Sequence, residues 1–107
     1  MKFEVIVAER ADAFRLLKGA DAEVGQKVLV GAGVTAVFQG ARVQKSANYP
    51  TVAAFELEGS AADAGDKVWE WLAETLPAGA QGVAFDGIDA PYEEASVKRI
   101  VAAKLAG

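Results

Sequence analysis

The order in which the hydrophobic periodicity changes along this chain is the feature that most constrains its fold. Residues 2–9 alternate apolar and polar side chains, as a half-buried strand does, and residues 10–18 carry apolar side chains at helical spacing. Residues 27–30 form a short apolar run between Gly25 and Gly31, which predicts a second strand. The amino-terminal third is therefore predicted to be strand, helix, strand.

The segment 34–43 decides between two architectures. Its valines and Gly40 disfavour a helix, and the turn-forming segment 45–50 separates it from a further strand pattern at 51–58. We therefore predict that 34–43 and 51–58 form a β-hairpin. If 34–43 were helical instead, strands and helices would alternate throughout and the sheet would be mostly parallel.

The clearest helix is predicted at 61–76. Ser60 precedes it, and Asp63 follows three residues later as an acidic variant of a capping box. Pro77 and Gly79 are expected to end it. Its predicted apolar face consists of Val68, Leu72 and Leu76.

The carboxyl-terminal segment is predicted to add one strand and one helix. Residues 82–85 have the pattern of a strand, followed by a turn at Asp86 and Gly87. Asp89 is expected to cap the last helix, because Pro91 suits a first helical turn. The apolar stripe of that helix is Val97, Val101 and Leu105.

These elements predict a single α+β domain over residues 1–107. Two strand-helix units that flank a hairpin form the split βαβ, or ferredoxin-like, arrangement, here with an extra C-terminal helix. Hydrophobic residues make up 52% of the chain and charged residues 24%, which is typical of a globular protein. The chain has no cysteine and no segment that reads as a signal peptide, so we expect a cytoplasmic protein.

The residue types that most catalytic sites need are missing. Because the chain has no histidine and no cysteine, Ser-His and Cys-His arrangements are excluded. The acidic loop 86–89 lacks the ligand ladder of a calcium site. A net charge of −4 with scattered basic residues argues against binding to nucleic acid. We predict a protein that is not an enzyme and uses no cofactor or metal.

One motif resembles a nucleotide-binding fingerprint over nine residues. Residues 28–36 read as a strand followed by GxGxxA, the pattern that brings backbone N–H groups to a pyrophosphate at a helix N-terminus. It follows the second strand, however, and too little chain remains for the two halves of a dinucleotide domain. The competing interpretation is a glycine-containing turn between two strands.

Aromatic and acidic residues are the candidate binding residues, because tryptophan and tyrosine are frequent at interaction hot spots. On helix 61–76, the helical rotation places Trp69 at the core edge and Trp71 in a partly exposed position. Tyr92 falls opposite the apolar stripe of the last helix, and Tyr49 lies in the hairpin loop. The predicted partner-binding residues are Trp71, Glu70, Glu74, Asp63, Tyr49 and Tyr92.

Negative charge, exposed aromatic residues and absent catalytic residues together favour a protein-binding domain. Its concrete form would be a small acidic inhibitor or immunity-type protein that masks a basic protein partner. One alternative is a structural subunit that forms a homo-oligomer through sheet edges or helices. Another is a small-ligand or nucleotide-binding domain that uses the Gly31-Ala36 turn. Membranes are not expected as partners, since no segment is long and apolar enough to span one.

Overall fold

The computed structural model describes residues 1–43 and 50–105, which form six strands and three helices. In chain order these are β1 (Lys2–Val7), α1 (Arg10–Arg15), β2 (Lys27–Gly31), β3 (Val34–Val43), β4 (Thr51–Gly59), α2 (Ala64–Thr75), β5 (Gly82–Phe85), β6 (Ile88–Ala90) and α3 (Glu94–Leu105). The strands form one antiparallel sheet in the order β2-β3-β4-β1-β5-β6. The predicted α+β class is confirmed, and the alternative of a mostly parallel sheet is wrong.

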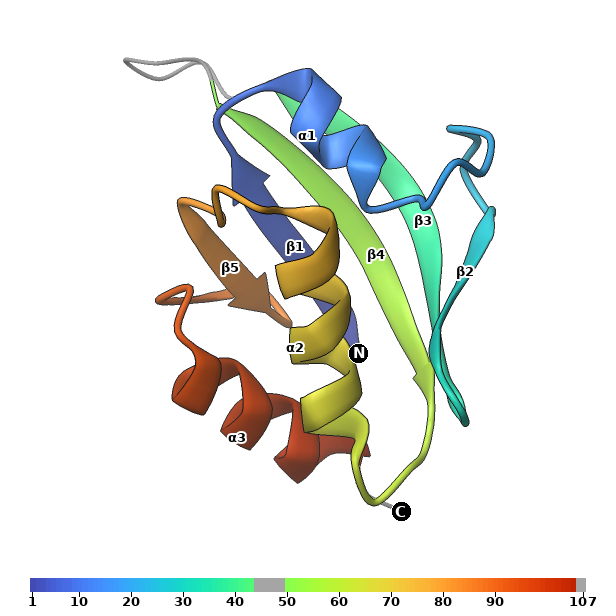
Figure 1. Ribbon diagram of the computed structural model, residues 1–107, viewed down its shortest axis with the longest axis vertical. Coiled ribbons are helices and arrows are strands. Elements are labelled where there is room, and N and C mark those ends of the chain that lie inside the picture. The colour runs from blue at the N-terminus through green and yellow to red at the C-terminus, as the bar shows by residue number, and fades with distance from the viewer. Residues whose placement is uncertain (44–49, 106–107) are drawn as a thin grey trace.

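The segment 34–43 is a strand, as the hairpin prediction required. β3 pairs with β4 antiparallel along its length, and Figure 1 shows the two running side by side. The pairing register shifts next to Gly40, whose backbone φ is +116°. A β-bulge of this kind suits glycine, which reaches positive φ without steric cost. Gly40, which disfavours a helix at this position, therefore allows the bulge in β3.

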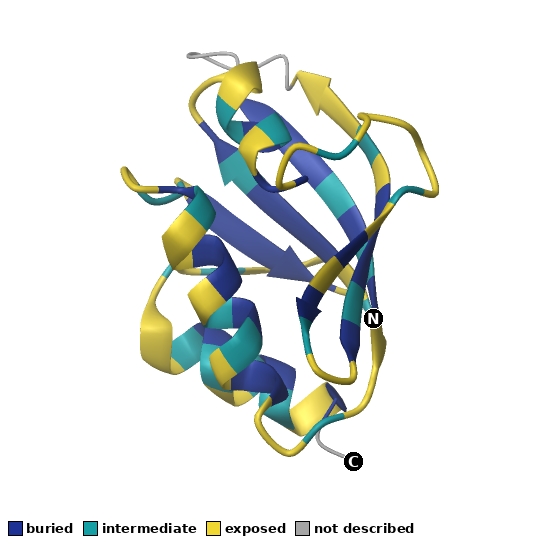
Figure 2. Ribbon diagram, turned by 45° about the vertical axis from the view of Figure 1, so that its right-hand side comes forward, coloured by how far each residue is buried: buried dark blue, intermediate teal, exposed yellow. Residues whose placement is uncertain are grey.

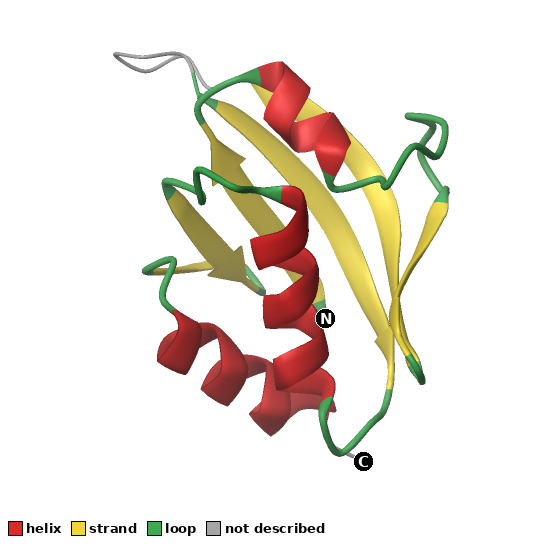
Figure 3. Ribbon diagram, in the orientation of Figure 1, coloured by secondary structure: helices red, strands yellow, loops and turns green. Residues whose placement is uncertain are grey.

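The helices lie on one face of the sheet, so the molecule has two layers. Figures 1 and 3 show α1 and α2 in front of the strands and α3 beside α2. On the helix side of β1, Phe3, Val5 and Val7 are buried in the predicted alternation, and Phe55 and Leu57 of β4 are buried with them. Figure 2 shows the buried residues gathered on the strands and on the inner sides of the helices. The core fills the space between these two layers.

The apolar faces predicted for the two long helices are confirmed. Their buried residues include Val68, Leu72 and Leu76 of the first helix segment and Val97, Val101 and Leu105 of the second. α2 and α3 approach each other closely at Gly65, where an added Cβ would lie 2.4 Å from the backbone oxygen of Lys98. The absence of a side chain at Gly65 therefore sets the distance between these helices.

The predicted start of the long helix is wrong. α2 begins at Ala64, and Asp63 occupies the N-cap position without a side-chain hydrogen bond. The backbone N–H of Ser60 donates to the oxygen of Gly33 at 3.0 Å, and that of Ala61 donates to the oxygen of Leu105 at 3.0 Å. The backbone of Ser60 is therefore bonded to the β2–β3 turn and that of Ala61 to the end of α3, and the capping box does not form.

A strand that the sequence pattern did not predict, β6, lies between β5 and the last helix. The turn at Asp86 and Gly87 is confirmed, with φ of +51° and +84°. Positive φ at both central residues is typical of a two-residue hairpin turn, so the chain returns along β5 as β6. Asp89 lies in this strand and not at a helix cap, and α3 begins at Glu94.

β2 forms one edge of the sheet, and a side chain covers part of it. α1 ends at Arg15, and Lys18 after it adopts a positive φ of +53°. The Nζ of Lys18 donates to the backbone oxygen of Leu29 in β2 at 3.2 Å. A lysine at an edge strand opposes pairing with another chain.

Candidate functional site

Trp71 is a core residue, and its predicted partial exposure is wrong. Only 1% of its surface is exposed. Its indole Nε1 donates to the backbone oxygen of Leu16 at 3.0 Å, and its ring stands edge-on to Phe55 with centroids 5.2 Å apart. The segment after α1 covers the flank of α2 that carries Trp71, so this residue is not available as a surface anchor in this conformation.

Trp69 and Tyr92 form the aromatic pair that lies at the surface. Both side chains are half-buried, and their ring centroids lie 5.0 Å apart at an interplanar angle of 38°. The position predicted for Trp69, at the edge of the core, is confirmed. Tyr92 precedes α3 instead of lying on it, and burial raises the pKa of its phenol. Tyr49 lies outside the described residues.

The acidic residues predicted on α2 are exposed. Glu70 and Glu74 project from α2, and Asp63 lies at its N-cap. The Nζ of Lys67 lies 4.0 Å from Asp63 Oδ2 and 3.6 Å from Glu70 Oε2. Glu74 forms no ion pair with any described residue. The acidic face is therefore only partly neutralised by its own lysine.

Asp66 is a further exposed acidic residue of this face, and it was not among the predicted binding residues. The Nζ of Lys98 on α3 lies 3.3 Å from Asp66 Oδ1 and 3.0 Å from Glu94 Oε2. The hydrogen bond to Glu94, followed by that to Asp66, raises the pKa of Lys98. The spacing of Asp66 four residues before Glu70 was the signal available in the sequence. We name the group Asp63, Asp66, Glu70, Glu74, Trp69 and Tyr92 the α2 surface.

The Gly31-Ala36 segment is a hairpin turn followed by a strand. No helix follows the glycines, so the strand-turn-helix context of a nucleotide-binding fingerprint is absent from this segment. An added Cβ at Gly31 would lie 2.7 Å from the side chain of Lys67, and Gly33 accepts a hydrogen bond from Ser60. These glycines therefore let the turn pack against the start of α2.

A buried carboxylate lies on the sheet face that the helices leave open. Glu4 in β1 is 8% exposed, and Arg42 of β3 reaches across β4 to place Nη2 at 2.7 Å from Glu4 Oε2. The oxygen Oε2 accepts no aligned hydrogen bond, so this contact is a charge pair. Beside it lies a hollow of about 150 Å³ over Ala54 and the Gly40 bulge. Arg42 therefore compensates the charge that β1 buries at Glu4.

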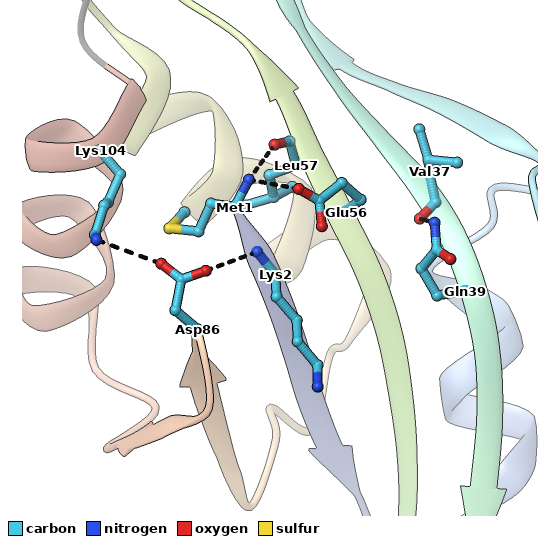
Figure 4. A network of polar contacts seen from close by, with 8 residues as sticks. All are labelled: Met1, Lys2, Val37, Gln39, Glu56, Leu57, Asp86 and Lys104. Atoms are coloured by element: carbon cyan, nitrogen blue, oxygen red, sulfur yellow. Dashed lines mark hydrogen bonds and ion pairs between the residues drawn. The ribbon is translucent and has the colours of Figure 1, made fainter.

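A polar network joins β1, β5 and α3 (Figure 4). Asp86 accepts a hydrogen bond of 3.0 Å from the backbone N–H of Lys2, and its Oδ2 lies 3.4 Å from Lys104 Nζ. The Lys2 hydrogen bond, together with Lys104, holds the pKa of Asp86 below its ordinary value. The amino group of Met1 lies 2.8 Å from Glu56 Oε1. Each of these groups already has a structural partner.

Comparisons with known proteins returned no match: no protein-family model, no curated protein and no solved structure. Within residues 1–43 and 50–105, no cluster of three or more histidine, cysteine, aspartate or glutamate residues is placed to hold a metal ion. No helix in the same ranges has the length and apolar character needed to cross a membrane.

Proposed function

We propose that this protein is a non-enzymatic protein-binding domain, in the manner of a small acidic inhibitor or immunity-type protein, and that it contacts a basic partner through the α2 surface. The observation that carries this proposal is the placement of Trp69 and Tyr92 beside the row of carboxylates on α2. Half-exposed aromatic residues supply contact area, and surrounding charges supply orientation.

Charge supports a basic partner. The α2 surface and the adjoining Glu94 hold five carboxylates, while Lys67 and Lys98 are the only cations among residues 1–43 and 50–105 that pair with them. Glu74, without an ion pair among the described residues, contributes its full charge to the field in front of α2. With a net charge of −4 for the whole chain, the field favours encounter with a positively charged protein.

The ferredoxin-like arrangement belongs to the same proposal. If β2 and β6 are regarded as additions, the remaining strands are ordered β3-β4-β1-β5 and the chain runs β1-α1-β3-β4-α2-β5. That succession supports a split βαβ unit. α3 then serves as the extra C-terminal helix that buttresses α2 and positions Tyr92.

The test is capture of the partner with matched charge-reversal variants. Tagged wild-type protein, the E70K/E74K variant and the D21K/E23K variant are used as bait, and captured proteins are identified by mass spectrometry. Asp21 and Glu23 are exposed residues of the loop before β2, so the control makes the same charge change away from α2. We expect a basic protein to be captured by wild type and control and lost with E70K/E74K.

Measuring association and dissociation rates with the captured partner separates the contribution of the aromatic residues from that of the carboxylates. Trp69→Ala should weaken the complex by about 2 kcal/mol or more, mainly through faster dissociation. E70K/E74K should slow association and reduce its dependence on salt. Equal capture by all three baits would contradict the α2 surface as the binding site. Light scattering on the same samples tests the homo-oligomer alternative.

A further inference from the structure

An apolar cavity of about 200 Å³ lies between the β5–β6 hairpin and α3. Its walls are Phe85, Ile88 and Ala90 from the hairpin and Ile100 from α3. Asp86, Asp89 and Lys104 complete the lining, and Lys104 is already paired with Asp86. A cavity of this size and character accommodates one apolar side chain.

The cavity opens at the edge of the sheet. β6 is the last strand in the sheet order, and Ile88 pairs directly with Phe85, so both side chains project toward the helix layer. Phe85 is only 4% exposed, whereas Ile88 is 73% exposed. α3 therefore covers β5 but leaves the neighbouring position on β6 open.

The backbone of β6 has a free side. Hydrogen-bonded and non-hydrogen-bonded residue pairs alternate along an antiparallel ladder. The two-residue turn makes Phe85 and Ile88 a hydrogen-bonded pair, so the next pair, which contains Asp89, is not hydrogen-bonded. The backbone N–H and C=O groups of Asp89 therefore face away from β5. The opposite edge of the sheet differs, because Lys18 bonds to the Leu29 carbonyl there. Among the described residues, no side chain forms a hydrogen bond of this kind to the free edge of β6.

The charge beside this edge is negative. The side chain of Asp89 lies on the sheet face opposite to Ile88, is exposed, and forms no ion pair with a described residue. A basic side chain opposite Asp89 would complement it across the strands.

We propose that the β6 edge and this cavity bind an extended segment of a partner protein by strand addition. Backbone N–H and C=O groups of the segment pair with those of Asp89, and one apolar side chain enters the cavity beside Ile88 and Ile100. The adjacent residue of the segment is lysine or arginine and pairs with Asp89. This interaction shares no residue with the α2 surface and does not depend on it.

The test is selection from a library of displayed linear decapeptides. The bait proteins are wild type, Ile88→Lys, Leu29→Lys and Asp89→Lys. Leu29 is 68% exposed on the other edge strand, so Leu29→Lys is the matched control for Ile88→Lys. All three replaced side chains are exposed, and a thermal melt of each variant confirms folding before selection.

Wild type and Leu29→Lys should enrich peptides in which an apolar residue is followed or preceded by lysine or arginine. Ile88→Lys should lose this enrichment, and Asp89→Lys should select acidic residues in place of the basic ones. The most enriched peptide, titrated into labelled protein, should shift the amide resonances of β6 and Ile100. Its affinity for Ile88→Lys should fall about 10- to 100-fold, as loss of one buried aliphatic contact implies.

Four results would overturn the proposal. The first is that wild type enriches no peptide beyond those that Ile88→Lys enriches. The second is that Asp89→Lys still selects basic residues. The third is that the peptide shifts amide resonances of β2 instead of β6. The fourth is concentration-dependent dimerisation through β6 without peptide, which would make a second copy of this chain the occupant. The E70K/E74K variant should retain the peptide, so failure here is distinguishable from failure of the α2 surface.

Discussion

The indole of Trp71 and the backbone oxygen of Leu16 are joined by a hydrogen bond of 3.0 Å. The bond links α2 to the segment that follows α1, while the ring packs edge-on against Phe55 of β4. One side chain therefore links α2, the segment after α1 and the sheet. Its removal should affect the whole core.

Trp71→Ala should lower the free energy of unfolding by about 3–5 kcal/mol, the usual cost of truncating a buried aromatic residue. Trp71→Phe keeps an aromatic ring but leaves the Leu16 oxygen without its donor, and should cost about 1–3 kcal/mol. Urea unfolding of the two variants measures both values. A loss under about 1 kcal/mol for Trp71→Ala would show that this residue is not packed as described.

Gly65→Ala should destabilise the protein, although alanine is the better helix former. The new Cβ would lie 2.4 Å from the Lys98 oxygen, so α3 must move, and we expect a loss of about 1–3 kcal/mol. Ala73→Gly at an exposed position of α2 is the control and should cost about 1 kcal/mol from helix propensity alone. Stabilisation by Gly65→Ala would mean that the helices are less closely packed.

Arg42→Ala should lower the free energy of unfolding, because it leaves the carboxylate of Glu4 buried without a positive partner. Because the arginine side chain is 58% exposed, we expect a loss of about 1–3 kcal/mol, less than for a fully buried pair. Adding Glu4→Gln to Arg42→Ala removes the unpaired charge and should recover part of the loss. Chemical unfolding of the two single variants and the double variant forms the cycle. Strict additivity would contradict a charge pair between these residues.

Asp86 should make stability depend on acid pH. The Lys2 hydrogen bond, with Lys104, holds the pKa of its carboxyl below the ordinary value of about 3.9. A lowered pKa in the folded state contributes stability above the unfolded-state pKa, and this contribution is lost as pH falls through the folded-state pKa.

Asp86→Asn is the informative variant, because asparagine tolerates the φ of +51° but carries no charge. Its free energy of unfolding should fall below that of wild type by a constant amount from about pH 6 to pH 8, and the gap should narrow below about pH 4. Urea titrations at each pH measure this. A gap of the same size at pH 3 and pH 7 would rule out an ionic role for Asp86.

Much of the local structure was predictable from the residues. The alternation in 2–9 and 51–58 identified two strands with their buried faces, and the 3.6-residue stripes identified the inner faces of α2 and α3. β3 was also predictable, because its valines and Gly40 are costly in a helix. Less predictable were the helix starts, because Ser60 and Ala61 form backbone bonds to distant segments.

The candidate site was predicted only in part. The exposure of Glu70 and Glu74 follows from helical rotation alone, since no described element packs over that side of α2. The pairing of Trp69 with Tyr92 joins residues distant in the chain and has no local signal. β6 was missed although the Asp86-Gly87 turn favours a hairpin, because Asp89 and Pro91 also match a helix start.

The sequence by itself determined which faces of its strands and helices are apolar, which residue types are available for chemistry, and the sign of the surface charge. Only the tertiary structure decided that Trp71 is buried and Trp69 lies at the surface, although both flank the same stripe. The physical reason is that α1 and the chain after it pack on one side of α2, whereas Tyr92 and α3 lie on the other. The periodicity of a helix predicts the direction in which each side chain points from the helix axis. The neighbouring elements determine which of those side chains remain exposed to solvent.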